Sequence, residues 1–355
     1  MEHETTYSRD ALRRMISAIS QSWRLRDATL VDSGHHNVYV LNLETEAGGQ
    51  AAVLKATPDG ASPTCNSEAR MQAILNAHTD IPVPDVFGVV DDHDDLPAPF
   101  ILQSQLPGRN YRRDVIQDLS PADVENLAYS TGRYLAELHA LDAVDAYGFV
   151  SIESPETLTG ERPSSDLDQI IVKDPRDSWK TYVNDSATQL VTALEDTRFA
   201  DERDRIESAT EQCADRIVGQ FDPVVSRIDT AIDTLRLDPE TSEITGIRDW
   251  EFCMAAPPAY DLVFVLHSLV DSFWSLLPTI PNHRETAEAS LLSGYEEVGE
   301  SQAIEQYHAN KESYNLLVSL HSMLNFENWF DRVGIEGNRR NHAADQLRSR
   351  LYRFS

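Results

Sequence analysis

The chain has 355 residues, with 30 Lys and Arg against 59 Asp and Glu, so its formal net charge is −29. The length suits two domains or one large bilobal unit, and a hydrophobic content of 41% is enough to form cores, which excludes global disorder. A field this negative repels phosphate backbones, so we expect no nucleic-acid partner. The sequence has no apolar run near the roughly 20 residues of a bilayer span and begins without the apolar stretch of a signal peptide. We therefore expect a cytoplasmic protein with no membrane partner.

The acidic excess is combined with a scarcity of lysine. Lysine supplies only 4 of the 30 basic residues, and arginine supplies the rest. Acidic surfaces stay hydrated in concentrated salt, where screening removes the self-repulsion of the charges. The composition therefore predicts a halophilic protein, and binding of a cationic partner is the alternative. The lysines are Lys55, Lys173, Lys180 and Lys311.

The first predicted elements are a strand, a small-residue turn and a hairpin. The strand covers 28–31, and two further strands, over 38–43 and 51–56, flank a tight turn. Two glycines at 48–49 supply the positive φ that such a turn needs. Lys55 lies near the end of the third strand, inside an apolar run.

A helix is predicted over 67–75, because its apolar positions fall on one helical face. Glu68 lies in the first turns of this helix. A strand lysine followed by a helical glutamate is the arrangement with which protein-kinase-like folds hold nucleotide phosphates. A solvated lysine at the end of a strand is the alternative interpretation of Lys55.

The next segments carry longer motifs. Residues 80–88 read Asp-Ile-Pro-Val-Pro-Asp-Val-Phe-Gly, and residues 99–108 read Pro-Phe-Ile-Leu-Gln-Ser-Gln-Leu-Pro-Gly. With the Glu-Ala pair that opens the preceding helix, they resemble the aminoglycoside phosphotransferase family, which has D-I-P-V-P-x-V-x-G and P-F-x-x-M-E-x-L-P-G. Gln103 and Ser104 replace the family's Met-Glu at the hinge between the lobes.

The resemblance implies an α+β, bilobal protein-kinase-like fold. The N-lobe, residues 1–104, would contain an antiparallel sheet and one helix and bind the nucleotide. The C-lobe, residues 105–355, would be mainly helical and contain the catalytic loop and the acceptor-binding helices. The implied cofactors are ATP (or GTP) and Mg²⁺, with the base bound by main-chain groups of the hinge. The residues implied in nucleotide binding are Lys55, Glu68, Ser33, Gly34, Gln103, Ser104 and Leu106.

Beyond the hinge the periodicity is helical. A helix predicted over 121–141 ends in a segment similar to the family's L-x-x-L-H-x-L, where we expect a packing or capping role for His139. Residues 151–178 are polar and predict an irregular loop insertion. Two amphipathic helices are then predicted over 179–194 and 201–218.

The segment 223–261 resembles the family's catalytic region, which reads H-G-D-x-x-x-x-N, a hairpin and D-W-E. The resemblance places Asp229 at the catalytic aspartate, which orients the acceptor hydroxyl and accepts its proton. It places Asp249 at the metal-binding aspartate, whose oxygens suit Mg²⁺. Asp261, in Pro-x-x-Asp-Leu at 258–262, falls on the aspartate that supports the active-site loops.

Three positions of this region differ from the family's pattern, and a fourth, Asp233, lies beside one of them. Thr234 replaces the family's asparagine and is a poorer Mg²⁺ ligand, and Asp233 is the adjacent carboxylate that would substitute for it. Arg227 replaces the histidine of H-G-D, and Arg248 precedes D-W-E. We expect the two guanidinium groups to pair with the two aspartates and to compete with Mg²⁺ for their oxygens.

Three functions remain open at this point. The main prediction is an ATP-dependent phosphotransferase acting on a hydroxyl group of a small molecule. A catalytically degenerate relative that binds nucleotide or a small ligand without turnover is one alternative, and a protein-interaction module using the C-terminal helices is another. Zinc sites and serine hydrolases are excluded, because the ligand spacing and the G-x-S-x-G motif are missing from the sequence. The aromatic residues that suggest an interaction module are Trp274, Tyr295, Tyr307, Tyr314, Trp329 and Phe330.

Overall fold

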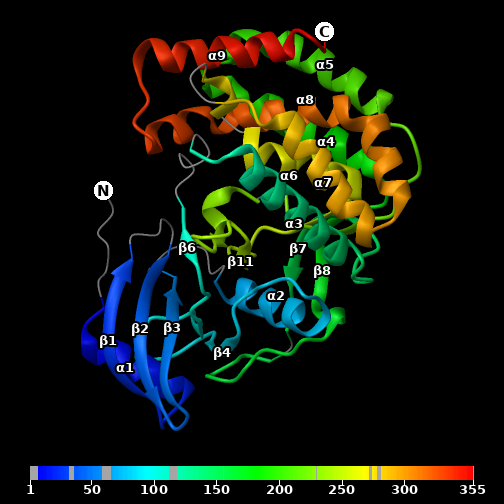
Figure 1. Ribbon diagram of the computed structural model, residues 1–355. Helices are drawn as coiled ribbons and strands as arrows, with labels where there is room; N and C mark the ends of the chain where they lie inside the picture. The colour runs from blue at the N-terminus through cyan, green and yellow to red at the C-terminus, as the bar shows by residue number, and fades with distance from the viewer. Residues whose placement is uncertain are drawn as a thin grey trace.

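In a computed structural model the chain forms two lobes, a small one built on a five-stranded sheet and a larger one made mainly of helices (Figure 1). This α+β architecture confirms the predicted fold class. In the part of the chain that the structure describes, no helix is both long enough and apolar enough to cross a membrane. The described residues are 7–31, 36–57, 65–111, 118–154, 156–228, 230–271, 274–277 and 281–354.

The sheet of the small lobe is antiparallel. Its strands are β1 (Arg24–Val31), β2 (Asn37–Thr45), β3 (Gly48–Ala56), β4 (Val86–Val90) and β5 (Phe100–Ser104), in the order β1-β2-β3-β5-β4. The predicted hairpin is β2–β3, and Gly48 at its turn has a φ of +115°, which glycine adopts without strain. The end of β5 is also the predicted boundary between the lobes.

Two helices pack on this sheet, where one was predicted. The expected helix is α2 (Cys65–His78), and the additional one is α1 (Arg9–Ile19). Leu12, Met15 and Ile16 of α1 are buried in the apolar core of the small lobe. Their spacing of three and four residues is the helical signal, but the charged residues around them hide it in the sequence.

A segment of the large lobe returns to the small lobe and covers the edge strand β4. The main-chain N–H of Asp91 donates to the carbonyl of Leu158 at 2.8 Å, and that of Val89 donates to the carbonyl of Glu161 at 3.0 Å. Leu158 also packs with Ala69 of α2 in one small apolar cluster. This segment therefore fixes α2 and β4 to the large lobe.

The described part of the large lobe contains two small antiparallel sheets, ordered β11-β10-β6 and β8-β7-β12-β9. Their strands are β6 (Arg109–Asn110), β7 (Tyr147–Ile152), β8 (Ile170–Arg176), β9 (Val224–Ser226), β10 (Leu235–Leu237), β11 (Ile244–Ile247) and β12 (Met254–Ala256). The prediction of a wholly irregular insertion over 151–178 was wrong, because β8 lies within it. The apolar residues 170–172 form this strand by pairing with β7.

The helices predicted in the first half of the large lobe are confirmed. The helices of this lobe are α3 (Pro121–His139), α4 (Trp179–Ala193), α5 (Arg203–Arg216), α6 (Pro258–Leu266), α7 (Arg284–Val298), α8 (Ser301–Arg332) and α9 (Gly337–Leu351). Helices α3 and α7 cross so closely that a Cβ atom on Gly132 or on Gly294 would collide with the main chain of the other helix. Glycine at both positions permits the contact.

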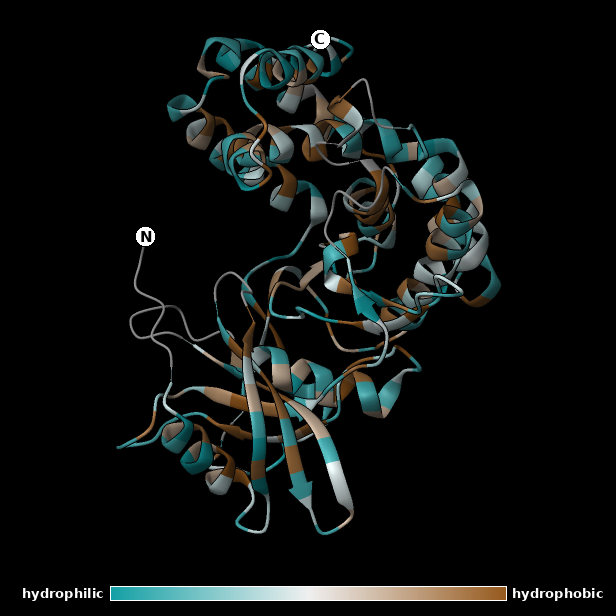
Figure 2. Cartoon of the chain, turned by 60° about the vertical axis from the view of Figure 1, so that its left-hand side comes forward, coloured by the Kyte–Doolittle hydropathy of each residue, from teal (hydrophilic) through white to brown (hydrophobic). Residues whose placement is uncertain are grey.

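The aromatic residues of the C-terminal helices belong to the core. Tyr295, Tyr307, Tyr314 and Phe330 are buried, and Trp329 is half-buried against the same cluster. Figure 2 shows hydrophobic and hydrophilic residues sharing the outer helices, as expected where one side of a helix faces a core. For these five residues the placement removes the observation on which the protein-interaction hypothesis rested, and the side chain of Trp274 lies outside the described part of the structure.

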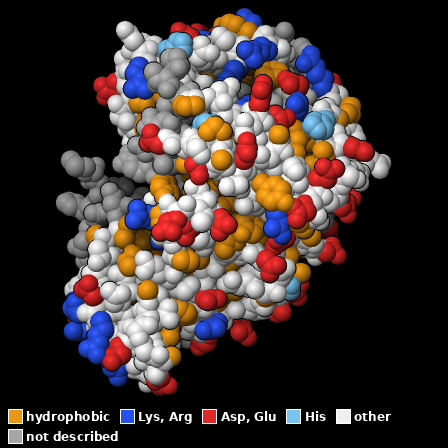
Figure 3. All heavy atoms as spheres, viewed as in Figure 1, with side chains coloured by type: hydrophobic (Ala, Val, Ile, Leu, Met, Phe, Trp, Pro, Cys, Tyr) orange, Lys and Arg blue, Asp and Glu red, His pale blue; other side chains and the backbone are white. Residues whose placement is uncertain are grey.

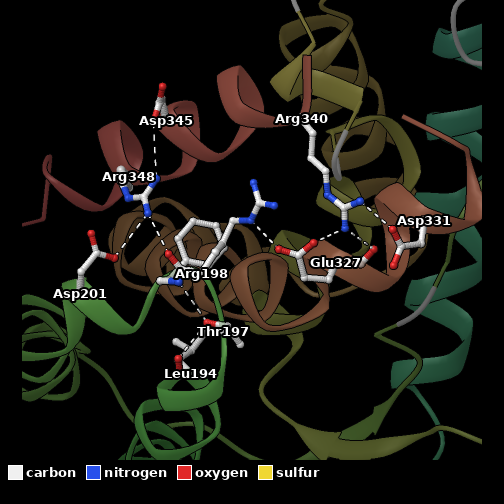
Figure 4. Close-up of polar contacts among 10 residues, drawn as sticks. Leu194, Thr197, Arg198, Asp201, Glu327, Asp331, Arg340, Asp345 and Arg348 are labelled. Carbon is white, nitrogen blue, oxygen red and sulfur yellow. Dashed lines mark hydrogen bonds and ion pairs between the residues drawn. The ribbon is translucent and has the colours of Figure 1, made fainter. Parts of the chain in front are cut away.

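Helix α9 is fastened to the large lobe by a network of ion pairs (Figure 4). Glu327 of α8 accepts from the guanidinium groups of Arg198 and Arg340. Arg340 also pairs with Asp331 at 2.6 Å, and Arg348 donates to the main-chain carbonyl of Arg198 at 2.8 Å. The network joins α8, α9 and the turn before α5.

Candidate nucleotide and metal site

A buried ion pair joins β3 to α2. The Nζ of Lys55 donates to Oε2 of Glu68 at 2.5 Å, and both residues are buried. The other oxygen, Oε1, accepts from the side-chain amide of Gln72 and from the main-chain N–H of Asp249, each at 3.1 Å. The structure thus brings Lys55 and Glu68 together as predicted, and Glu68 also contacts the large lobe.

Three carboxylates surround the Lys55 ammonium. Its Nζ lies 3.4 Å from Oδ1 of Asp249 and 3.7 Å from Oε1 of Glu251, in addition to its bond to Glu68. One oxygen of each acid lies within 4.8 Å of the others. We refer to Glu68, Asp249 and Glu251 as the carboxylate group. When ionised it carries three negative charges against one positive charge, so a divalent cation would neutralise the difference.

The pKa values in this group follow from burial and from the opposite charges. Burial alone would lower the pKa of Lys55, but the three carboxylates outweigh it and raise that pKa above its ordinary value. Burial raises the pKa of Glu68, and Lys55 opposes the change. Burial also works against ionisation of Asp249, yet Lys55 and Arg248 hold its pKa below the ordinary value. Lys55 and Asp249 are therefore both charged at neutral pH.

Asp249 and Glu251 fit the requirements of Mg²⁺, which prefers carboxylate oxygens. Within the described residues, Oε2 of Glu251 is buried and has no hydrogen-bond partner, a costly state unless a cation or a water molecule satisfies it. The side chain of Asp249 is 41% exposed, so it is open to a ligand that comes from solvent. Glu251 was not predicted as a site residue, although its place in D-W-E is a signal that could have identified it.

Thr234 and Asp233, predicted as metal ligands, lie on a 3₁₀ turn (Ile232–Thr234). The Thr234 hydroxyl donates to the carbonyl of Ala231 at 2.8 Å and accepts from the guanidinium of Arg227 at 3.1 Å. A guanidinium beside a hydroxyl repels a metal cation, so Thr234 fits the role of a ligand poorly. Asp233 is not a member of the carboxylate group.

The expected competition between arginines and Mg²⁺ is wrong at Asp249. Among the described residues, Lys55 is the cation that forms an ion pair with Asp249. The guanidinium groups of Arg227 and Arg248 instead donate to main-chain carbonyls. Asp229, the other expected partner, lies outside the described residues, so its catalytic role and its pairing stay predictions.

Asp261 supports the two residues that precede the predicted catalytic aspartate. Its carboxylate accepts from the main-chain N–H groups of Arg227 and Ile228, at 3.0 and 2.8 Å. Its Oδ2 also lies 2.9 Å from Nε2 of His139, whose Nδ1 lies 3.0 Å from the hydroxyl of Tyr295. Ile228 has a φ of +54°, an unfavourable value for a β-branched residue, so these bonds hold a strained turn in place.

The hinge offers main-chain groups for a base. Gln103 is buried in β5, and Ser104 ends that strand. In the part of the chain that the structure describes, neither the N–H nor the C=O of Leu106 has a hydrogen-bond partner. An N–H donor beside a C=O acceptor is the pattern that the edge of a purine can use. The predicted phosphate-loop residues, Ser33 and Gly34, lie outside the described residues.

Aminoglycoside phosphotransferases are among the solved structures with the same overall arrangement. APH(2'')-Ib with ADP bound is 14% identical, with 98% of this chain and 99% of that chain covered and a TM-score of 0.58. APH(2'')-IIa in complex with gentamicin is 14% identical, with 98% and 97% covered and a TM-score of 0.56. A putative aminoglycoside phosphotransferase from Ralstonia eutropha is 14% identical, with 98% and 96% covered and a TM-score of 0.60.

These identities establish the fold and no more. The search of curated protein sequences gave no match. The model of the phosphotransferase enzyme family matches residues 27–300, which is more than half of the chain and includes both Lys55 and Asp249. The chain belongs to the phosphotransferase enzyme family.

Proposed function

We propose that this protein uses ATP, or GTP, together with Mg²⁺ to phosphorylate a hydroxyl group of a small molecule. The observation that carries the proposal is the Lys55 ammonium, which lies within 3.7 Å of three carboxylates where β3, α2 and the D-W-E segment meet. Several structural neighbours support a nucleotide, because they are complexes with ADP, GDP or AMP-PNP, some of them together with hygromycin B or kanamycin.

The small lobe would bind the nucleotide. Lys55 would contact the phosphates, and Glu68 would hold its ammonium in position. The main-chain groups of Leu106 would bind the base, and we assign residues 1–104 to this task. The remaining members of the nucleotide site are Ser33, Gly34, Gln103 and Ser104.

Residues 105–355 would provide the catalytic loop and the acceptor-binding helices. Asp249 and Glu251 would hold Mg²⁺, which when bound supplies positive charge to the phosphate oxygens. Asp229 would orient the acceptor hydroxyl and accept its proton as the new bond to phosphorus forms. Asp261 would keep the strained turn before Asp229 in place.

A second candidate is a relative that binds nucleotide without turnover. Its support is the Thr234 hydroxyl, which is bonded to Arg227 at the position where the family has an asparagine. Metal-independent binding of ADP would favour this candidate, whereas metal-dependent binding of ATP with consumption of ATP would favour the enzyme.

The proposed acceptor is a hydroxyl-bearing metabolite rather than an antibiotic. The acidic surface could suggest a cationic ligand, but the halophilic hypothesis already explains it. The reaction would take place in the cytoplasm, where nucleoside triphosphates are available. The test is incubation with ATP, Mg²⁺ and a panel of hydroxyl metabolites and aminoglycosides in concentrated KCl, with detection of phosphorylated product by mass spectrometry. We expect a product for at least one acceptor and none with Asp229→Asn. ADP binding without any product over the whole panel would favour the second candidate.

A further inference from the structure

Two segments of the large lobe meet beside the carboxylate group, and two arginines connect them. The segments are the described residues of the predicted catalytic loop, 227–228 and 230–234, and the segment 248–251, which contains D-W-E. Nη2 of Arg227 donates to the main-chain carbonyl of Arg248 at 2.6 Å, and Nη2 of Arg248 donates to the main-chain carbonyl of Asp233 at 2.6 Å. Each arginine thus binds the main chain of the other segment. We refer to Arg227 and Arg248 as the arginine clamp.

The guanidinium of Arg227 is fixed on several sides. Its Nε donates to the hydroxyl of Thr230 and its Nη2 to the hydroxyl of Thr234, each at 3.1 Å. Its Cζ lies 4.2 Å from the centroid of the Trp250 ring, and the residue is only 3% exposed. A planar group that donates in several directions and stacks on a ring is specific to arginine, because lysine presents a compact point charge.

The clamp contacts the residues on both sides of Asp249. The carbonyl of Arg248 is bonded to Arg227, and the ring of Trp250 stacks on the same guanidinium. Asp249 itself has a φ of +61°, a conformation that is uncommon in residues other than glycine and persists where its surroundings impose it. The clamp therefore fixes the direction of the Asp249 carboxylate while Lys55 forms the ion pair with it.

We propose that Arg227 is a positioning residue: through its contacts with the segment 248–251 it sets the Asp249 carboxylate against the catalytic loop, with no metal ligand supplied by Thr234. This inference rests on the proposed function, because it assigns the metal to Asp249 and Glu251. Arg227 does not touch the metal in this arrangement, and its charge opposes metal binding. Geometry, rather than charge, is therefore what a substitution must change to weaken the site.

The test is binding of Tb³⁺ alone, measured by luminescence sensitised through tryptophan, since Trp250 lies between the two proposed ligands. A solution with about 1 M KCl screens the other surface carboxylates. In Arg227→Lys, which keeps the charge but not the planar fork, we expect the affinity for Tb³⁺ to fall at least tenfold. Arg248→Lys should weaken binding in the same direction and is the second variant, because this residue is more exposed and its substitution disturbs folding less.

The matched control is Arg348→Lys. Arg348 also donates to a main-chain carbonyl, that of Arg198 (Figure 4), and its Cζ lies 5.3 Å from the centroid of the Phe199 ring. Its helix, α9, lies at the end of the large lobe away from the small lobe (Figure 1). We expect its affinity for Tb³⁺ to equal that of the parent. Unchanged affinity in both Arg227→Lys and Arg248→Lys would overturn the inference, as would an equal loss in the control. A lower melting temperature of Arg227→Lys with unchanged affinity would show a structural role only, and would also overturn it.

The double variant Arg227→His, Thr234→Asn restores the family's residues and gives an independent result. If the clamp positions Asp249, this variant binds Tb³⁺ less tightly than the parent. If the parent site only lacks the asparagine ligand, the variant binds Tb³⁺ more tightly. Failure of the proposed function has a different signature: Tb³⁺ binding would respond to the clamp variants, but ADP would not stabilise the parent against heat. Stabilisation by ADP together with unchanged Tb³⁺ affinity in the clamp variants would contradict the inference and leave the proposed function standing.

Discussion

The main-chain N–H of Asp249 donates to Oε1 of Glu68 at 3.1 Å, although the two residues are 181 positions apart in the chain. The other oxygen of Glu68 accepts from Lys55. One carboxylate of the small lobe therefore fixes both the proposed phosphate-binding lysine and the main chain of the proposed metal ligand. Glu68 thus links the two lobes at the site.

Glu68→Gln separates these two tasks. The amide oxygen can still accept from Asp249, but Lys55 loses its ionic partner and is left with Asp249 and Glu251. We expect the affinity for Mg²⁺-ADP to fall at least tenfold and the free energy of unfolding to fall by about 1–3 kcal/mol, measured by calorimetry and by urea unfolding. Glu288→Gln, which removes the acid that pairs with Lys311 at 2.9 Å, is the control and should leave ADP affinity unchanged. Equal ADP affinity in the two variants would contradict the role given to Glu68.

Asp91 gives a pH dependence of stability. It pairs with Arg70 at 2.7 Å and accepts from the main-chain N–H of Leu158 at 2.7 Å. Burial opposes ionisation, but these bonds outweigh it and hold the pKa of Asp91 below its ordinary value. A lowered carboxyl pKa contributes stability that is complete above the unfolded pKa of about 4 and is lost as the pH falls through the folded pKa.

The test compares the free energy of unfolding of the parent and of Asp91→Asn, measured by urea unfolding from roughly pH 3 to pH 7. We expect the variant to be less stable by about 1–3 kcal/mol between roughly pH 5 and 7, with the difference shrinking below about pH 4. Asp95→Asn is the control, because its pair with Arg14 spans 3.7 Å between exposed side chains. A difference that stays constant or grows at low pH would refute the assignment.

Asp261→Asn tests the support of the catalytic loop. An amide keeps one acceptor oxygen and turns its NH₂ group toward the main-chain N–H of either Arg227 or Ile228, so one buried donor loses its partner. We expect a loss of roughly 1–3 kcal/mol in stability and a fall in turnover beyond that of Tyr295→Phe, which removes only the outer contact to His139. Equal turnover in the two variants would show that the loop does not depend on Asp261.

The salt response tests the halophilic hypothesis. Acidic side chains are spread over the visible face of the molecule (Figure 3), in keeping with the net charge of −29. Screening of this repulsion should raise the melting temperature as KCl increases, whereas the ion pairs of Glu327 should weaken. We therefore expect Glu327→Gln to cost less stability in concentrated than in dilute KCl. A melting temperature that falls steadily with KCl would contradict the hypothesis.

The sequence was sufficient for the parts of the site that depend on one motif each. Lys55 and Glu68 follow from a strand, a helix and their order, and Asp249 follows from the D-W-E motif. Glu251 belongs to the same motif but was missed, because its contact with Lys55 depends on how the chain bends after Asp249. That bend includes the positive φ of Asp249, which the residue type does not reveal.

The arginines could not be placed from the sequence. Opposite formal charges favoured ion pairs with Asp229 and Asp249. At Asp249 this expectation was wrong, because the register of the two segments brings main-chain carbonyls within reach of the guanidinium groups of Arg227 and Arg248. Every residue has a main-chain carbonyl, so the sequence does not show which carbonyl accepts from an arginine. The same reason hid the two hydrogen bonds that Val89 and Asp91 donate to the carbonyls of Glu161 and Leu158, because both join main-chain groups.

The most direct test of the account is calorimetric titration of ADP into the parent protein, with and without Mg²⁺, and into Lys55→Met and Lys311→Met. Lys55 is the ammonium at the centre of the carboxylate group, whereas Lys311 pairs with Glu288 in the α7–α8 region, so the two variants differ in site and not in chemistry. The account predicts Mg²⁺-dependent binding in the parent, unchanged binding in Lys311→Met, and at least a tenfold loss in Lys55→Met with the fold intact by circular dichroism. An ADP affinity of the parent that does not depend on Mg²⁺, or an ADP affinity that is unchanged in Lys55→Met, would contradict the account.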